Sequence, residues 1–183
     1  IADTMDSVLA QTYQNWEMII MDDCSTDGGP DIVKEYSAKD SRIRYFRNER
    51  NQGVSKTRNA AMQKASGRYL AFLDSDDLCY PTKLEEQIKY MKKNKYSFSY
   101  TSYEEIDEND VTNGVKVTGP KKITKMGMYR YCWPGCLTVM YDAEKIGKIQ
   151  IADIKKNNDY AMWLKVIKKA NCYHYDKVLA QYR

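Results

Sequence analysis

The segment Tyr69-Leu-Ala-Phe-Leu-Asp-Ser-Asp-Asp77 decides how this sequence is interpreted, because an apolar run stops at three carboxylates. Residues 69–73 have the length and apolar character of a buried strand. Like charges repel most where a buried strand limits solvation, and a hard cation such as Mg2+ or Mn2+ relieves the repulsion. This segment alone therefore fits two interpretations equally well. One is a metal site at a strand end, and the other is a solvated turn that caps a helix from Thr82.

Strand and helix patterns alternate through residues 1–95. Strand-like apolar runs lie at 17–21, 43–46 and 69–73, and helical patterns lie at 5–9, 30–36, 53–67 and 82–93. Such alternation with short connections predicts a parallel, doubly wound sheet, which binds ligands at the carboxyl ends of its strands. Asp22-Asp23 and Asp74-Ser75-Asp76 both fall at such ends. We therefore expect two acidic strand ends to meet in one crevice.

Residues 96–183 follow a different pattern. We expect strands at 96–103, 115–117 (an edge strand), 136–141 and 178–182, and a helix at 123–131. A strong amphipathic helix with Met162 and Trp163 on its apolar side follows the polar run 157–159. There are no internal repeats or linker-like stretches, so the sequence predicts one domain over residues 1–183.

The composition is that of a soluble globular protein, with 43% hydrophobic and 30% charged residues and a net charge of +4. No apolar stretch is long enough to span a bilayer. The 16 tyrosines fall mostly inside apolar patterns, which argues against base stacking, and we expect no nucleic-acid partner. Peripheral contact with a membrane stays open, although no basic amphipathic stripe supports it. The paired lysines available for it are Lys92-Lys93, Lys121-Lys122, Lys155-Lys156 and Lys168-Lys169.

The five cysteines are odd in number and irregularly spaced, which favours free thiols in a reducing cytoplasm. Only Cys132 and Cys136 lie close together, and no second pair completes a zinc site. The single histidine, His174, sits in an apolar run and is expected to be a packed or strand-end residue. Cysteine-protease chemistry and histidine metal clusters are therefore excluded.

Taken in order, these motifs resemble the family 2 inverting glycosyltransferases, which have the GT-A fold and use nucleotide-sugar donors. The resemblance implies an α/β, mostly parallel sheet flanked by helices, with residues 1–95 as the nucleotide-binding half and 96–183 as the acceptor-side half. It also implies that the family's first strand lies before residue 1. The segments that carry it are Ser7-Val-Leu-Ala-Gln-Thr12, Asp22-Asp-Cys-Ser-Thr-Asp27, Asn51-Gln-Gly-Val-Ser-Lys-Thr-Arg-Asn-Ala60, Gly67 to Asp77, Asn158-Asp159 and Leu179-Ala-Gln-Tyr-Arg183.

Roles follow from the resemblance, position by position. Asp23 resembles the aspartate that binds the nucleotide base, and Arg58 the arginine beside the diphosphate. Asp76 resembles the ligand of Mn2+ or Mg2+, with Asp74 and Ser75 near the ribose or the metal. Asp159 resembles the general base, and Trp133 would border the acceptor.

Each of these residues also has a purely structural interpretation. Asp159 could be a helix N-cap, Arg58 an exposed helix residue, and Trp133 a core residue before a turn. Asp22 could merely satisfy loop amides, and Asp77 is expected to be a cap.

The expected function is metal-dependent, inverting transfer of a sugar from a nucleotide-diphosphate donor, UDP by resemblance, to a glycan or lipid-linked hydroxyl. The setting would be bacterial cell-surface polysaccharide synthesis in the cytoplasm or at the inner membrane face. A Gln-x-x-Arg-Trp motif is absent, which favours a non-processive enzyme. Asn158 stands where the family usually has an acidic residue. Two alternatives stay open, namely a non-catalytic nucleotide-sugar-binding domain and a nucleotidyltransferase that makes nucleotide sugars.

Overall fold

The structure is a computed structural model and describes residues 1–154 and 156–183, so the pair Lys155-Lys156 is described only at Lys156. Helices and strands alternate from α1 to β3, and a second short strand, β4, precedes α4. The helical elements are α1 Ala2–Leu9, α2 Gly29–Lys39, α3 Val54–Lys64, α4 Lys83–Asn94, α5 Lys125–Arg130, η1 Cys136–Thr138, α6 Ala143–Ile146 and α7 Asn158–Val166. The strands are β1 Met18–Asp22, β2 Ile43–Arg47, β3 Tyr69–Ala71, β4 Leu78–Cys79, β5 Phe98–Ile106, β6 Thr112–Val117, β7 Lys122–Ile123, β8 Met140–Asp142 and β9 Cys172–Tyr182.

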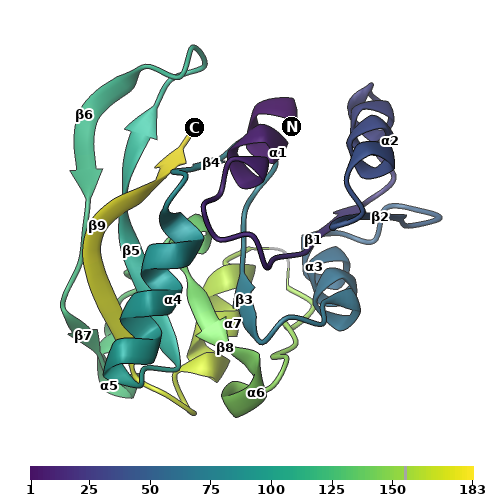
Figure 1. Cartoon of the computed structure of the whole chain (residues 1–183). Helices are drawn as coiled ribbons and strands as arrows, with labels where there is room; N and C mark the ends of the chain where they lie inside the picture. The colour runs from purple at the N-terminus through teal and green to yellow at the C-terminus, as the bar shows by residue number, and fades with distance from the viewer. Residues whose placement is uncertain (155) are drawn as a thin grey trace.

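The described strands form two sheets, and Figure 1 shows the smaller one on the side of α2 and α3. The smaller sheet is the parallel pair β1-β2. The larger has the order β3-β8-β5-β9-β4, with β6 on β5 and β7 on β9. Its strands β5 and β9 are parallel, whereas β3-β8, β5-β8, β5-β6, β4-β9 and β7-β9 are antiparallel.

The expectation of a mostly parallel sheet is therefore wrong for the larger sheet. Only β5-β9 is parallel among its described pairings, and the other parallel pair, β1-β2, forms the smaller sheet. In the second half, β5 pairs in the antiparallel direction with both β6 and β8, so these strands are not joined by the parallel strand-helix-strand units that the sequence predicted. Its run 136–141 was expected to be one strand, but it begins as the 3-10 turn η1. There the hydroxyl of Thr138 donates to the carbonyl of Gly135 (2.7 Å), which closes a turn and delays the strand to Met140.

A groove separates β1 from β3, which are not paired with each other. It encloses about 380 Å3 and is lined by apolar side chains of α1, β1, α3 and β3, including Met5, Ile20, Ala61 and Phe72.

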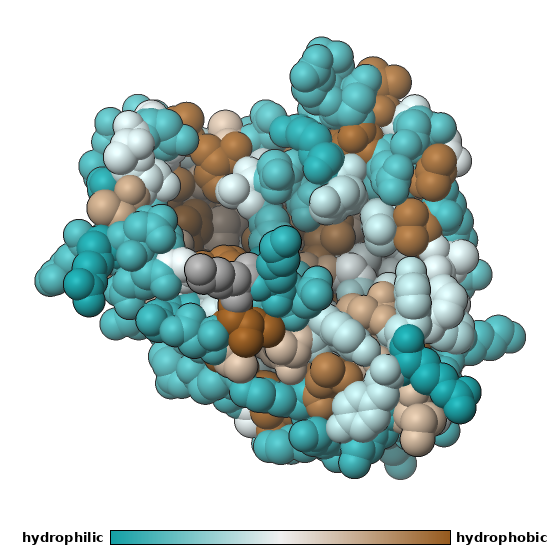
Figure 2. Space-filling model, turned by 180° about the vertical axis from the view of Figure 1, so that it is seen from behind, coloured by the Kyte–Doolittle hydropathy of each residue, from teal (hydrophilic) through white to brown (hydrophobic). Residues whose placement is uncertain are grey.

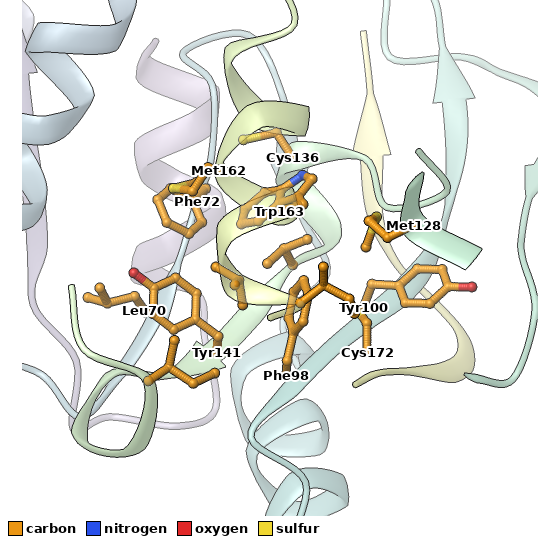
Figure 3. Close-up of a cluster of buried hydrophobic side chains, with 14 of the residues drawn as sticks. Leu70, Phe72, Phe98, Tyr100, Met128, Cys136, Tyr141, Met162, Trp163 and Cys172 are labelled. Atoms are coloured by element: carbon orange, nitrogen blue, oxygen red, sulfur yellow. The ribbon is translucent and has the colours of Figure 1, made fainter. Parts of the chain in front are cut away.

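A single apolar cluster fixes the end of β3 relative to α7 (Figure 3). Phe72 meets the fully buried Trp163 edge-on, with ring centroids 5.5 Å apart, and stacks on Tyr141 at 6.1 Å. Both halves of the chain contribute to the cluster. Burial of each large side chain stabilises the fold by roughly 1.5–3 kcal/mol, so the strand end and the helix are held in one rigid arrangement.

Among the described residues no helix is both long and apolar enough to cross a bilayer. The face seen from behind is mixed, with apolar groups in small clusters between hydrophilic ones (Figure 2).

His174, in β9, is 6% exposed and stacks on Tyr100 at 4.6 Å, which confirms that it is a packed residue. All five cysteines are free thiols.

Candidate active site

Arg58 joins the two carboxylates that the sequence assigned to opposite halves of the chain. Its guanidinium donates to Asp74, which follows β3, and to Asp159 in the first turn of α7. The Arg58 side chain is only 15% exposed, so it is not the exposed helix residue of the alternative interpretation. A planar guanidinium can hold two carboxylates at once, and it separates charges that would otherwise repel. The arrangement forms one charged site between α3, β3 and α7.

Asp159 is not the N-cap of α7, since Asn157 holds that position, with a left-handed backbone (φ 54°). Asp159 lies one turn before Trp163 in α7, and the packing of Trp163 against Phe72 sets the direction of this helix. Burial raises the pKa of Asp159 above its ordinary value, Arg58 opposes this, and Asp74 adds to it. A carboxyl group with a raised pKa is suited to accept a proton near neutral pH.

The loop from Asp74 to Asp77 turns at the open end of the groove. Thr4 in α1 donates to the carbonyl of Ser75 (2.9 Å), which ties the loop to the first helix. Asp76 is exposed, and no hydrogen bond to its side chain occurs among the described residues. Its oxygens are therefore free for another ligand.

No three His, Cys, Asp or Glu side chains in the described part of the chain are arranged so that they could hold a metal ion together. Mg2+ and related ions commonly bind through one or two carboxylates together with substrate phosphates and water. The exposed Asp76 with Asp74 two positions earlier provides hard oxygen donors of this kind. The residues fit an ion that arrives with a diphosphate.

Asp77 is buried and caps no helix, so the expectation of a cap was wrong; Thr82 occupies the N-cap position of α4. The carboxylate accepts from the backbone amide of Arg183 (3.2 Å), just after β9. Burial raises its pKa to about 7, with Asp74 and Asp76 acting in the same direction and the Arg183 amide opposing. Asp77 therefore fastens the end of β9 beneath the acidic loop, a contact across 106 positions that the local sequence could not reveal.

Asp22 and Asp23, at the end of β1, both accept hydrogen bonds that hold the neighbouring loops. Asp22 accepts from the Ser25 amide (2.8 Å) and the Tyr45 hydroxyl (2.8 Å), as the loop interpretation expected.

Asp23 accepts from the side-chain amide of Asn48 and the backbone amides of Gln52 and Gly53, each at 2.8 Å. Burial would raise the pKa of Asp23, but these hydrogen bonds lower it overall. Asp23 thus shapes the loop that starts α3, and its contact with a base stays a prediction.

Asp23 also connects to the Arg58 site through the side chain of Asn48. Asn48 donates to Asp23 and to the hydroxyl of Thr57 (3.0 Å), the neighbour of Arg58 on α3. Thr57, Arg58, Asp74 and Ser75 line the same groove. The structure therefore brings Asp23, Arg58, Asp74 and Asp159 into one region, by direct contact or through Asn48.

Trp133 is 43% exposed, so its interpretation as a core residue is wrong; the buried tryptophan is Trp163. Its ring packs against that of Tyr131, with centroids 4.6 Å apart. Behind it lies Gly119, where an added Cβ would come within 3.3 Å of the indole. Trp133 makes no hydrogen bond or ion pair with the Arg58 site among the described residues.

Comparison with known proteins assigns the chain to a family. Residues 1–140 match the model described as glycosyl transferase family 2. The chain belongs to this family. The resemblance read from the motifs is thereby confirmed, and with it the expectation that the chain is a glycosyltransferase.

Curated glycosyltransferases resemble the chain over nearly all of its length. TuaG of Bacillus subtilis (strain 168), assigned to teichuronic acid biosynthesis, is 41% identical over 100% of this chain and 73% of its own. WfgD of Escherichia coli, a UDP-Glc:alpha-D-GlcNAc-diphosphoundecaprenol beta-1,3-glucosyltransferase, is 42% identical over 93% of this chain. The chain spans 66% of WfgD.

Solved structures of glycosyltransferases confirm the GT-A fold. S. aureus TarS 1-349 in complex with UDP has a TM-score of 0.82 at 22% identity, covering 100% of this chain and 56% of that one. The mannosyltransferase PcManGT from Pyrobaculum calidifontis, in complex with GDP-Man and Mn2+, has a TM-score of 0.76 at 15% identity. It covers 100% of this chain and 52% of that one.

Proposed function

We propose that this chain is the donor-binding and catalytic part of a metal-dependent, inverting, non-processive glycosyltransferase. It moves a sugar from a UDP-sugar to a hydroxyl of a glycan or lipid-linked acceptor in bacterial cell-surface polysaccharide synthesis. The observation that carries the proposal is the contact of Arg58 with both Asp74 and Asp159. A candidate base thus lies across a cation from the acidic loop, and this arrangement supports a displacement at an anomeric carbon.

The named relatives support the donor and the acceptor class. The name of WfgD specifies UDP-Glc and a diphosphoundecaprenol-linked acceptor, and TuaG is assigned to a cell-wall polymer. Solved structures of similar fold hold UDP or UDP-GlcNAc, and one holds GDP-Man with Mn2+. A divalent ion held by Asp76 and Asp74 would neutralise negative charge on the departing nucleoside diphosphate.

Arg58 provides a positive charge that does not depend on an ion. Its guanidinium already holds two carboxylates, and phosphate oxygens would compete for the same donors. When a diphosphate takes up this charge, Asp159 is released from its ion pair. The ion pair therefore keeps the base neutralised until the donor is bound.

Asp159 takes the proton of the acceptor hydroxyl as that hydroxyl attacks. Burial raises its pKa, which brings its basicity closer to that needed near neutral pH. A single displacement inverts the anomeric centre and requires no second nucleophilic carboxylate. Trp133, exposed with Tyr131, offers an aromatic face to the acceptor.

Two isosteric variants test the proposal. Asp159→Asn should lower transfer by about 100-fold or more, because general bases contribute 10²–10⁴-fold. UDP binding with Mn2+ should be retained or tighter, because the variant has no carboxylate that competes with the diphosphate for Arg58. Asp76→Asn should remove the part of UDP binding that depends on Mn2+. Asp153→Asn is the matched control and should change neither; Asp153 is an exposed carboxylate whose ion pair among the described residues is with Lys56. Isothermal titration and a radiolabelled-sugar transfer assay give both readouts.

The alternatives predict other results. A non-catalytic binding domain would show no transfer to lose and would be indifferent to Asp159→Asn. A nucleotidyltransferase would join a sugar phosphate to a nucleoside triphosphate, and pyrophosphate would leave the triphosphate. UDP binding that needs neither Mn2+ nor Asp76 would refute the metal assignment.

A further inference from the structure

A basic and aromatic surface lies beside the site, on the segment that runs from β7 through α5 to the loop after it. Met126 is 60% exposed, Tyr129 44%, Tyr131 59% and Trp133 43%. These four residues and the cations described below are called the α5 surface. Large apolar side chains this exposed need an explanation when they gather on one short segment.

The cations of the α5 surface have no acidic neighbours along the chain. From Val111 to Tyr141 there is no aspartate or glutamate. The exposed cations within this stretch, apart from one lysine that is paired with Asp176, are Lys121, Lys122, Lys125 and Arg130. None of these four forms an ion pair with any described residue. The surface therefore concentrates positive charge in a chain whose net charge is only +4.

The fold holds this surface outward. Met128 is fully buried and Ile123 is 2% exposed, so α5 is fixed to the core by its inner side. The hydroxyl of Tyr160 donates to the carbonyl of Met128 (2.7 Å), which ties α5 to the helix that carries Asp159. In Figure 1, α5 lies next to β7 at one end of the larger sheet. The outer residues are thus presented by a rigid support.

The α5 surface also borders the catalytic residues. Tyr160, which holds α5, is the neighbour of Asp159 in α7. Trp133, proposed above to face the acceptor, belongs to the surface itself. An acceptor that approaches Asp159 along this side therefore passes the aromatic and basic residues.

From these contacts we propose that the α5 surface docks on the headgroup layer of an anionic phospholipid bilayer. Tyrosine and tryptophan are enriched at headgroup depth, and lysine and arginine are attracted to anionic lipid. Aromatic and methionine side chains surrounded by unpaired cations fit a bilayer better than a protein interface, whose centre is depleted of charge. The apolar area is small, so docking is peripheral and reversible. This inference rests on the proposed function for its purpose, which is to bring a lipid-linked acceptor to Asp159.

Co-sedimentation with vesicles tests the proposal without donor or acceptor. The protein should bind vesicles of phosphatidylcholine with about one third phosphatidylglycerol, and binding should weaken at high salt, since screening shortens charge attraction. It should bind pure phosphatidylcholine weakly. Each cation is expected to contribute about a fivefold gain in partition, so Lys125→Gln with Arg130→Gln should lower it about 25-fold.

A second double variant, Met126→Ser with Tyr129→Ser, tests the apolar contribution to vesicle binding. It should also weaken binding, but the dependence of binding on salt should stay as in the wild type. The matched controls are Lys92→Gln with Lys93→Gln at the exposed end of α4, and Ile32→Ser on α2. They should bind like the wild type. Unchanged UDP binding verifies that each variant is folded.

Three results would overturn the proposal. The first is that the α5 variants bind anionic vesicles as well as the wild type does, and the second is that the wild type binds neutral and anionic vesicles equally. The third is that the wild type self-associates and the α5 variants do not, which would make the surface an interface between copies. Failure of the proposed function is distinguishable. In that case vesicle binding would persist while transfer to an acceptor without a lipid tail is absent.

Discussion

Arg58 is the residue whose removal should have the largest consequence. Arg58→Met leaves Asp74 and Asp159 facing each other without a cation, so we expect transfer to fall by about 100-fold or more. The free energy of unfolding should fall by about 2 kcal/mol, because two partly exposed carboxylates lose the largely buried cation that they share. Steady-state kinetics and urea unfolding measure the two effects.

Lys56→Met is a suitable control, because Lys56 lies on the same helix in an exposed pair with Asp153. Surface pairs contribute about 0–1 kcal/mol, so neither readout should change much. Arg58→Lys keeps the charge but not the planar fork, and it should recover only part of the activity. Full activity of Arg58→Met would contradict the role given to this residue.

At the residue scale, sequence motifs identified Arg58, Asp74 and Asp159 as candidates but not their contact. Arg58 lies 16 positions from Asp74 and 101 from Asp159, and no local pattern encodes such a separation. The same reason explains why Asp77 was expected to be a cap, since its partner is the amide of Arg183. The chemistry of a residue can be predicted from the sequence, whereas its long-range partner depends on the fold.

At the scale of elements, the parallel pair β5-β9 contains a histidine that links stability to pH. The ring of His174 lies 3.0 Å from the Ser102 hydroxyl (Nε2 to Oγ) and stacks on Tyr100. Burial lowers the pKa of His174, Lys116 acts in the same direction, and Asp176 opposes both. The neutral form is therefore the one that the folded state favours.

The stability contributed by His174 should fall as the pH drops below the ordinary histidine pKa of about 6.5, whereas Asp77, whose pKa burial raises to about 7, acts in the opposite direction, so the effect is measured as the difference between the wild type and a His174 variant. The unfolded chain then binds a proton that the folded chain resists, so the unfolding equilibrium shifts toward the protonated, unfolded state. His174→Gln should reduce this loss between about pH 7.5 and 5.5. Urea unfolding at both pH values measures it. Because the chain has one histidine, a loss of the same size in the variant would contradict the assignment.

Most elements could be predicted from periodicity, including the helix at 82–93, which the structure gives as α4, and the edge strand at 115–117, within β6. The run 136–141 was mispredicted because its apolar, β-branched composition suits a strand, but the Thr138 hydroxyl closes a turn first. Strand direction in the second half could not be predicted from the residues alone. Residues that pack in a parallel strand pack equally well in an antiparallel one.

At the scale of the whole molecule, the groove between β1 and β3 should be visible in hydrogen exchange. The amide of Met18 donates to the carbonyl of Arg42 (2.9 Å) on the β2 side. Because backbone groups alternate along a strand, the amides of Ile19 and Met21 point to the groove. We expect these two to exchange much faster than that of Ile20, as measured by NMR. Equal protection of all three would mean that the groove is closed in solution.

Strand edges with free amides and carbonyls recruit extended segments from other molecules. Proteins usually face this hazard at the rim of a sheet, but here the edges of β1 and β3 border one groove, whose lining includes Arg58 and Asp74. A segment captured there would add a strand and reach the catalytic groups in one event. Loss of turnover and growth of aggregates in a concentrated sample would then have a single origin.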